Sequence, residues 1–447
     1  MKIVTIGAGS LAWGPTVNTD FLLNPHLDGA ELMLMDISPV NLGRVQQLLD
    51  RYVRERGFNK TIRATTDLRE ALAEADYVIT AISVGGDRLW RYDAMFPQIY
   101  SIYQPVGDTT GPGGLVRALR HAGPLLNVAR VMREVSKPDA VLIQLTNPMN
   151  PICTAIELLG GVTTYGICHG IDDTRRIVAE ALGKPIESVE VDAAGNNHLI
   201  FCTRIAVDGE VYGQERFGEL IPDVFDTPFR QAVWERYGGL VGNDSRHPIE
   251  FLPDFLTQEH RFGESWGVRP LAVQIDPMFG ERHDAAFDRI ERALAQEAPV
   301  RWRSHHRQGG LAIGEDGIAE TGHSREGLDD FIWALDSGEA LDIHVNVPNE
   351  GAIAGVPNEF NLEFPVRFEN GMMQRPEIAF NERITAEINR VGQEQFAIGK
   401  ACLDFDRDTL VDALALDALV PTRDLAARLV DEMIAFQHDY LNAYYPV

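Results

Sequence analysis

The chain has 447 residues, which is more than one hydrophobic core usually serves, so two lobes are expected. Its 40 lysines and arginines stand against 66 aspartates and glutamates, a formal net charge of −26, and no basic stripe with interleaved aromatic residues is present. That balance argues against a nucleic-acid partner. No stretch reaches the roughly 20 apolar residues of a membrane helix, so a membrane partner is not expected either.

The cysteines are sparse and lack the spacing of a disulfide framework: Cys153, Cys168, Cys202 and Cys402. The first residues pass straight into a glycine turn, without the longer apolar region and cleavage site of a signal peptide. Both features favour a reducing compartment, and we expect a cytoplasmic protein.

The N-terminal part alternates between short apolar runs and helix-compatible segments. The apolar runs predict strands at Lys2–Ile6, Glu31–Asp36, Thr61–Thr66, Tyr77–Ile82 and Ala140–Pro148. Amphipathic segments between them, at Asp67–Ala75 and Leu115–Val135, predict helices. This alternation is typical of the α/β class, with a Rossmann-like doubly wound parallel sheet that carries helices on both faces.

After about Val191 the alternation weakens. Longer helical patterns mix with strand-like runs such as Phe360–Phe368; the helical patterns are Pro228–Arg236, Ala285–Glu297, Arg383–Ile398 and Leu425–Tyr440. The sequence therefore predicts a Rossmann-like domain over residues 1–190 and an α+β second lobe over residues 191–447. No obvious linker separates them, so we expect tight packing.

Gly7-Ala8-Gly9-Ser10-Leu11-Ala12 directly follows the first strand and fits the G-x-G-x-x-G/A fingerprint. The first glycine permits the tight turn, the second lets a pyrophosphate approach the backbone, and the small Ala12 permits close helix packing. The phosphates would lie at a helix N-terminus, where unpaired N–H groups favour negative charge. Gly7, Gly9, Ser10 and Leu11 are the predicted cofactor contacts.

Asp36 ends the second strand, where a carboxylate can accept hydrogen bonds from an adenosine ribose and repel a 2′-phosphate. The first domain is therefore predicted to bind NAD in preference to NADP. The alternative is a glycine turn that merely reverses the chain.

Further polar residues follow predicted strands. Asp108 lies among threonines and glycines just before an amphipathic helix, and Asn147 follows the next apolar strand. In doubly wound sheets the ligand crevice lies outside the carboxyl ends of the strands, so Asp108, Asn147 and Cys168 are candidate site residues. A loop that only caps a helix is the alternative for Asp108.

Cys168 and His169 are adjacent, and His198 follows downstream. Adjacent residues of an extended chain point to opposite faces, so Cys168 with His198 is the more plausible ligand pair for a metal ion. A thiolate and an imidazole suit a borderline divalent cation, with water or substrate at the other positions. The spacing leaves a buried structural cysteine and a core histidine open as alternatives, and a Cys–His nucleophile pair lacks a protease signature.

Together these segments resemble the NAD- and manganese-dependent glycoside hydrolases of family 4. The matching motifs run in order along almost the whole chain: IGAGSLAW, QPVGDTTGPGGLVRALR, LTNPMNP, ICHG, AGNNHL and HVNVPNEGAIAGVPNEFNLEFPVRFENG. A lactate- or malate-type dehydrogenase is not expected to share the Cys-His and late Asn-rich segments.

The resemblance implies an α-glycosidase that recycles its cofactor. Bound NAD+ would take hydride from the sugar C3, a base would remove the C2 proton, the aglycone would leave C1, water would add, and the hydride would return. Mn2+, or another divalent cation, would lie on Cys168 and His198 and stabilise the developing charge. Asn147 would hydrogen-bond the sugar and help place C3 against the nicotinamide, and Asp108 would protonate the leaving oxygen.

The chain departs from many relatives in the segment that would hold the catalytic base. Many relatives have a tyrosine-rich segment after a histidine, whereas HPIEFLPDF has Phe251 and Asp254 at the tyrosine positions. Asp254 is the first candidate, because a carboxylate near a metal-acidified proton needs no strongly raised pKa. A loop-capping role is its alternative, and Tyr237 is the second candidate.

The motif CHG is more similar to the unphosphorylated α-glycoside branch, and particularly to uronic-acid enzymes, than to 6-phosphosugar enzymes. We expect an α-glucuronidase or α-galacturonidase acting on a small glycoside or oligosaccharide. His169 and Asn197 would face the substrate, and Arg269 or Arg261 would meet its C6 carboxylate.

Several alternatives stay open. An α-glucosidase or α-galactosidase of the same family is close, and a plain NAD-dependent sugar or 2-hydroxy acid dehydrogenase or a non-catalytic NAD-binding regulator would share the first domain. The family also implies a homodimer or homotetramer, with the second lobe as the catalytic and oligomerisation domain.

Overall fold

The computed structural model describes residues 1–11, 13–220, 227–271, 274, 291–292, 295, 302–303, 310–314, 317–324 and 326–445. Ala12 of the glycine turn and most of the helix expected at Ala285–Glu297 lie outside the described residues. Within the described part, no helix combines the length and the apolar character that crossing a membrane requires.

The predicted Rossmann-like half is confirmed as a parallel sheet with the strand order β3-β2-β1-β4-β5-β6. Its strands are β1 (Lys2–Ile6), β2 (Glu31–Met35), β3 (Thr61–Thr65), β4 (Tyr77–Thr80), β5 (Val141–Gln144) and β6 (Thr163–Gly166). Its helices are α1 (Trp13–Leu23), α2 (Pro39–Arg56), α3 (Leu68–Leu72), α4 (Gly86–Met95), α5 (Gly111–Val135), α6 (Met149–Leu159) and α7 (Gly170–Ala181).

Strand β1 shows why this sheet is covered on both faces. Ile3 packs into a core with apolar residues of α1 and α2, whereas Val4 and Ile6 pack into a second core with α3 and α5. Successive side chains of a strand point to opposite faces, so an uninterrupted apolar run needs helices on each side.

Helix α2 illustrates how the local sequence sets an element's bounds. The Ser38 hydroxyl accepts a hydrogen bond from the N–H of Asn41, Pro39 occupies the first turn, and the helix ends at Gly57 in a left-handed conformation. Its buried side chains recur every three or four residues: Leu42, Val45, Leu48, Leu49 and Tyr52.

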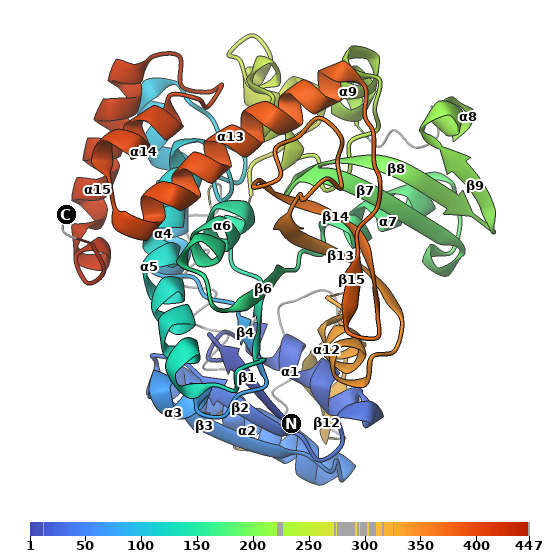
Figure 1. Ribbon diagram of the computed structural model, residues 1–447, viewed down its shortest axis with the longest axis vertical. Coiled ribbons are helices and arrows are strands. Elements are labelled where there is room, and N and C mark those ends of the chain that lie inside the picture. The colour runs from blue at the N-terminus through green and yellow to red at the C-terminus, as the bar shows by residue number, and fades with distance from the viewer. Residues whose placement is uncertain are drawn as a thin grey trace.

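The second half extends the same sheet. Beyond β6 the order continues antiparallel as β13-β14-β7-β8-β9, with β15 on β14, and β10-β11-β12 form a separate small sheet (Figure 1). These strands are β7 (Val189–Asn196), β8 (Leu199–Val207), β9 (Glu210–Gly213), β10 (Trp302–Arg303), β11 (Leu311–Gly314), β12 (Gly317–Glu320), β13 (Leu341–Pro348), β14 (Asn361–Glu369) and β15 (Met372–Gln374).

The C-terminal helices return to the first half of the chain and pack beside α5 and α6, as Figure 1 shows. Among the described residues of the second half, the α-helices are α8 (Phe217–Leu220), α9 (Pro228–Tyr237), α12 (Leu328–Ser337), α13 (Glu382–Asp404), α14 (Arg407–Leu414) and α15 (Arg423–Leu441). Ile398, Leu410 and Leu429 share one hydrophobic core with Val4. The two halves are thus joined by a common sheet and a common core, and the division at residue 190 stays a prediction.

Candidate active site

The glycine turn after β1 brings Asp36 onto the backbone of Gly9. The N–H of Gly9 donates to Asp36 Oδ2 at 2.9 Å, and a Cβ on Gly9 would lie 2.7 Å from the carboxyl carbon of Asp36. Gly7 has a φ of +91°, and a Cβ there would lie 2.2 Å from the carbonyl oxygen of Ala81. Glycine is therefore required at both positions, because a side chain would clash with Ala81 or with Asp36. The missing side chains leave a cradle beside the Asp36 carboxylate.

The next residues start α1. Ser10 Oγ accepts a hydrogen bond from the N–H of Trp13 at 3.2 Å, which caps the helix, while the Leu11 side chain is buried in the core. Any contact of Leu11 with a ligand must therefore be made by its backbone.

Ile37, directly after Asp36, is 88% exposed and offers an apolar surface beside the carboxylate.

Three side chains from distant parts of the chain meet in what we call the Asp–His–His cluster: Asp108, His198 and His247. One potential ligand atom from each lies within 4.8 Å of the other two, and the imidazole centroids are 4.2 Å apart. Thr109 Oγ1 donates to Asp108 Oδ1 at 2.6 Å and lies 2.7 Å from His198 Nδ1. These side chains thus form a hydrogen-bonded group, and their nitrogen and oxygen atoms are of the kinds that bind metal ions.

Backbone geometry places His198 in this cluster. Asn197 and His198 form the two-residue turn between β7 and β8, and His198 has a φ of +71°. A left-handed backbone is uncommon for a residue other than glycine and costs on the order of 1 kcal/mol or more. Such an outlier points to a functional reason for holding the imidazole there.

His247 lies at the end of a loop between α9 and the short helix η5 (Pro248–Phe251). The buried Arg230 donates to the carbonyl oxygens of Val241 and Asn243, and the N–H of Asn243 donates to Thr174 Oγ1 at 2.6 Å. The loop is therefore fixed before it reaches His247. No sequence pattern predicted His247 as a site residue; its only signal was its position directly before the segment expected to hold the base.

The loop that carries Asp108 is held by buried carboxyl groups of the second half. Glu250 accepts hydrogen bonds from the N–H groups of Val106 at 2.5 Å and Gly107 at 2.9 Å. Asp417 accepts one from the N–H of Gly111 at 2.8 Å. Burial raises the pKa of Glu250 to about 8. Asp108 is thus positioned by contacts on both sides.

Burial also controls the charges within the cluster. Burial, and then the neighbouring His247, lowers the pKa of His198 to about 3, and burial lowers the pKa of His247. Both imidazoles are therefore neutral at neutral pH and keep a lone pair. Burial opposes ionisation of Asp108, but the nearby His198, His247 and Arg117 outweigh it, so its pKa lies below the usual range. At neutral pH, where both imidazoles are neutral, Arg117 is the cation that acts on Asp108. The role of Asp108 as the acid stays a prediction, and a proton donor would need the opposite shift of this pKa.

Asn147 contacts this cluster, Asn197 directly precedes His198, and Cys168 is hydrogen-bonded to Asn197. Asn147 Nδ2 donates to Asp108 Oδ2 at 3.2 Å, and Asn197 Nδ2 donates to Glu363 at 2.8 Å. The carbonyl oxygens of both amides are buried without a hydrogen-bond partner among the described residues. The Cys168 thiol is hydrogen-bonded by Asn197 and by the N–H of Gly170, and burial raises its pKa well above the usual value. Cys168 is not a member of the cluster.

His169 begins α7 and lies between the two halves of the chain. Its Nδ1 is 3.0 Å from a carboxylate oxygen of the buried Glu326, and its ring centroid is 6.3 Å from that of Trp13, the first residue of α1. Partial burial lowers the pKa of His169, but Glu326 raises it more strongly, to about 9. His169 is therefore a cation at neutral pH.

The structure does not bring Asp254 or Tyr237 into the cluster. The short helix η6 (Pro253–Phe255) turns Asp254 outward, where its carboxylate is 65% exposed and pairs with Arg236 at 2.6 Å. Tyr237 is buried at the end of α9, and its hydroxyl donates to Glu387 at 3.4 Å. Neither predicted base contacts the Asp–His–His cluster in the described part of the chain.

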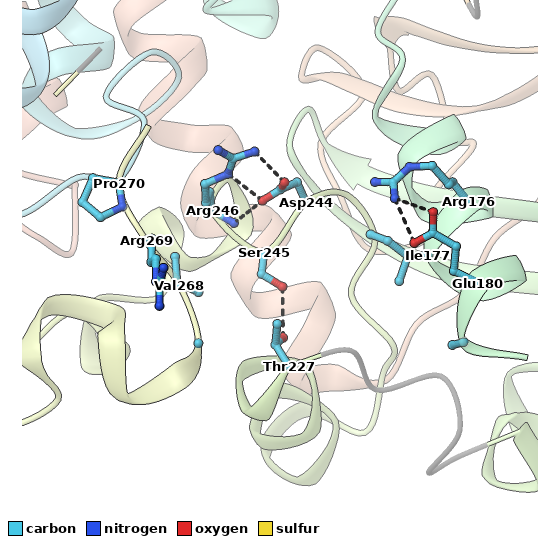
Figure 2. Close-up of a pocket in the computed structure, with 12 residues that line it drawn as sticks. Arg176, Ile177, Glu180, Thr227, Asp244, Ser245, Arg246, Val268, Arg269 and Pro270 are labelled. Carbon is cyan, nitrogen blue, oxygen red and sulfur yellow. Dashed lines mark hydrogen bonds and ion pairs between the residues drawn. The ribbon is translucent and has the colours of Figure 1, made fainter. Parts of the chain in front are cut away.

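A pocket of about 600 Å³ lies next to the segment that leads to His247. Figure 2 shows Arg269 at its wall, near Arg246, which pairs with Asp244 at 2.7 Å. Arg261, the other predicted carboxylate partner, instead pairs with Glu264 at 2.6 Å and is 69% exposed. Of the two arginines, Arg269 is the one that lines this pocket.

Comparisons with known proteins cover both halves of the chain. The model described as "Family 4 glycosyl hydrolase" matches residues 2–184, and that of the "Family 4 glycosyl hydrolase C-terminal domain" matches residues 193–420. An alpha-galactosidase of Rhizobium meliloti is 27% identical, with 99% of this chain and 89% of that protein covered. An alpha-galacturonidase of Thermoanaerobacterium saccharolyticum is also 27% identical, with coverage of 99% and 97%.

The fold has solved counterparts as well. The structure of a 6-phospho-alpha-glucosidase from gut microorganisms in complex with NAD and Mn2+ superposes with a TM-score of 0.80 at 18% identity, covering 98% of each chain. At 18% identity, this comparison shows that the two proteins share a fold.

Proposed function

The chain belongs to family 4 of the glycosyl hydrolases, and from this premise we propose that it hydrolyses an α-linked uronide, a glucuronide or galacturonide, with bound NAD and a divalent metal ion. The Asp–His–His cluster is the observation that carries the proposal. It offers neutral imidazoles and a carboxylate in contact with Asn147, which follows β5 of the parallel sheet. Ligand crevices of such sheets lie at the carboxyl ends of the strands.

The residues of the first half fit NAD. A side chain at Gly9 would fill the cradle beside Asp36, and the Asp36 carboxylate is placed to accept hydrogen bonds from a ribose. The exposed Ile37 offers an apolar face for an adenine ring. The chemistry of the cluster fits Mn2+ or a similar cation, with His198 as a ligand. When bound, NAD+ would supply a reversible oxidation at C3 and the metal a positive charge beside the neighbouring oxygens.

Asn147 and Asn197 are proposed to hold the sugar. Each has a buried carbonyl oxygen without a partner among the described residues, and leaving such a group unpaired costs about 1–3 kcal/mol. A sugar hydroxyl that donates to either oxygen would remove this cost. Their amide groups are already fixed by Asp108 and Glu363, so the free oxygens are oriented in advance.

The preference for a uronic acid is supported by cations near the site. His169, paired with Glu326, and Arg269, at the wall of the neighbouring pocket, are both suited to a C6 carboxylate. A relative with the name alpha-galacturonidase is consistent with this preference. An alpha-galactosidase at the same identity makes neutral α-hexosides the second candidate.

A panel of 4-nitrophenyl α-uronides and neutral α-hexosides, with NAD+ and Mn2+, tests the proposal. We expect release of 4-nitrophenol from an α-uronide, no net growth of NADH absorbance, and loss of activity with a chelator. A preference for neutral hexosides would contradict the uronic-acid assignment. Net NADH formation would indicate a dehydrogenase, and cofactor binding without turnover a regulator.

We further propose a homo-oligomer in a reducing, cytoplasmic setting. The four cysteines are all unpaired, which supports the setting. Ile99, in the short helix η2 (Phe96–Tyr100), and Phe436, on α15, are 72% and 51% exposed and offer apolar surface for self-association. Sedimentation velocity of the native chain and of the Phe436→Glu variant tests this.

A further inference from the structure

We propose that a buried pair of carboxyl groups, Glu394 and Asp417, positions the loop of Asp108 for the chemical step. Both are positioning residues, because they act on the loop through Thr110. This inference rests on the proposed function only in taking the Asp–His–His cluster to be part of the active site. No sequence motif pointed to the C-terminal helices as a support of that site.

Two consecutive threonines tie the loop to both sides. Thr109 Oγ1 donates to Asp108 Oδ1 at 2.6 Å and lies 2.7 Å from an imidazole nitrogen of the Asp–His–His cluster. The next hydroxyl, Thr110 Oγ1, donates to Asp417 Oδ2 at 3.0 Å and to Glu394 Oε1 at 3.3 Å. Since the two threonines are joined by one rigid peptide unit, a displacement of Thr110 also displaces Thr109 and Asp108.

The two carboxyl groups share one proton. Glu394 and Asp417 are 0% and 4% exposed, and two buried carboxylates in contact would repel each other. Burial, and then the neighbouring Asp417, raises the pKa of Glu394 well above its usual value, so Glu394 is neutral and donates to Asp417. Asp417 in turn accepts hydrogen bonds from the N–H groups of Gly111 at 2.8 Å and Leu419 at 2.6 Å. The pair is thus a single negative charge that is fixed on several sides.

Asp417 caps α5 from a distant part of the chain. The helix starts at Gly111, and the side chain of Thr110 at its N-cap position makes no capping hydrogen bond. The carboxylate of Asp417 takes this role, because an anion beside the first N–H groups of a helix is stabilised by them and by the helix dipole. The end of the Asp108 loop is therefore set by a residue 306 positions further along the chain.

Helix α13, which carries Glu394, also contacts the neighbours of other site residues. Three hydrogen bonds join it to residues that lie within four positions of His198, His247 or Asn147 along the chain. They are Asn196 Nδ2 to the carbonyl oxygen of Ile388 at 3.0 Å, Arg390 Nη2 to the carbonyl oxygen of Phe251 at 2.7 Å, and Asn150 Nδ2 to Gln395 Oε1 at 2.9 Å. One helix, which packs on α5 and α6 (Figure 1), therefore holds four separate segments of the site in place.

Variants of Glu394 test the pair. A misplacement of about 1 Å can cost about 10²-fold in rate, so we expect kcat of Glu394→Ala to fall at least about 10-fold, with KM and NAD affinity changed less than about threefold. Glu394→Gln keeps an N–H donor for Asp417 and an acceptor for Thr110, and should restore most of the lost kcat. Glu382→Ala, at an exposed position of α13, is the control. A folded Glu394→Ala with native kcat, or equal losses in Glu394→Ala and Glu394→Gln, would overturn the proposal.

Thr110→Val tests the same link if Glu394→Ala does not fold, because it removes only the hydroxyl. We expect a similar loss of kcat, retention of kcat in Thr110→Ser, and an unchanged melting temperature in both. Nuclear magnetic resonance of the His198 imidazole adds a readout without turnover: its signals should shift in Thr110→Val and stay in place in Thr110→Ser. Unchanged signals in both would refute the link. A chain that shows these shifts but cleaves no α-uronide would refute the proposed function and leave the pair standing.

Discussion

The glycine turn and the Asp–His–His cluster are assembled in different ways. The turn and Asp36 belong to one strand–helix–strand unit, and the contact between Gly9 and Asp36 follows from the parallel pairing of β1 with β2. The cluster takes Asp108 from a loop before α5, His198 from the β7–β8 turn and His247 from a loop before η5. A site within one unit can be located from a motif, whereas a site between units depends on the whole topology.

The most severe test of the cluster is His198→Ala. The family resemblance and the Asp–His–His cluster both include this imidazole, and loss of charge stabilisation at a reacting centre costs about 10²- to 10³-fold in rate or more. We expect glycosidase activity to fall by at least that factor and Mn2+ binding to be lost, as measured by 4-nitrophenol release and by titration. His438→Ala, at a 51% exposed position on α15, is the matched control. Retained activity would remove the cluster from the catalytic site.

Asp108→Asn should have the next largest effect. The amide oxygen can keep one of the two hydrogen bonds, from Thr109 or from Asn147, while the second acceptor oxygen and the negative charge are lost. The melting temperature of the variant shows whether the loop stays folded. We expect kcat/KM to fall by about 10²-fold or more, whether the carboxylate binds metal or transfers a proton. Asp439→Asn, at a 97% exposed position, controls for the change in net charge. Unchanged kinetics would contradict any chemical role for Asp108.

Asp36→Asn tests the glycine turn with a smaller effect. Hydrogen bonds to a charged group contribute about 1.5–3 kcal/mol, so losing the charge should weaken NAD binding by about 10- to 100-fold. Calorimetry with NAD and NADP should also show a smaller discrimination against NADP, because the repulsion of a 2′-phosphate is reduced. Asp139→Asn, at an exposed position outside the turn, is the control. Equal NAD affinity in both variants would mean that the turn binds no dinucleotide.

The difference between the glycine turn and the Asp–His–His cluster also explains which parts of the structure could be predicted from the sequence. Apolar runs and the G-x-G turn predicted the parallel half, and the strand-end rule anticipated that Asp108 and Asn147 lie together. His247 could not be predicted from the sequence, because its place depends on Arg230 and Thr174, which hold a loop without a periodic pattern. Asp254 was chosen from a motif position, and a motif does not reveal that a short helix turns its side chain to the surface.

Glu250 links the Asp108 loop to the second half and predicts a pH effect on stability. Its pKa is raised by burial to about 8, so the folded chain holds this proton more tightly than the unfolded chain. The stabilisation is complete below the ordinary carboxyl pKa and is lost as the pH rises through about 8. The melting temperature of Glu250→Gln, relative to the native chain, should therefore rise between about pH 5 and pH 8 and then level off.

Differential scanning calorimetry across this range checks the prediction for Glu250. Glu187→Gln, on the surface in a short helix before β7, is the control for removal of one carboxylate. A constant difference between Glu250→Gln and the native chain at all pH values would show that Glu250 is ionised in the folded state.

Asp254→Asn should have the smallest effect on activity. It tests whether a residue outside the Asp–His–His cluster takes part in the chemistry. Asp254 is 65% exposed and paired with Arg236, and an exposed ion pair contributes only about 0–1 kcal/mol to the free energy of unfolding. We expect kcat/KM to change less than about threefold, as it should in Arg236→Gln, which breaks the same pair. A loss of about 10²-fold in kcat with unchanged KM and melting temperature would make Asp254 the base. The local motif would then have located the chemistry better than the tertiary cluster, and the loop around η6 would have to move on substrate binding.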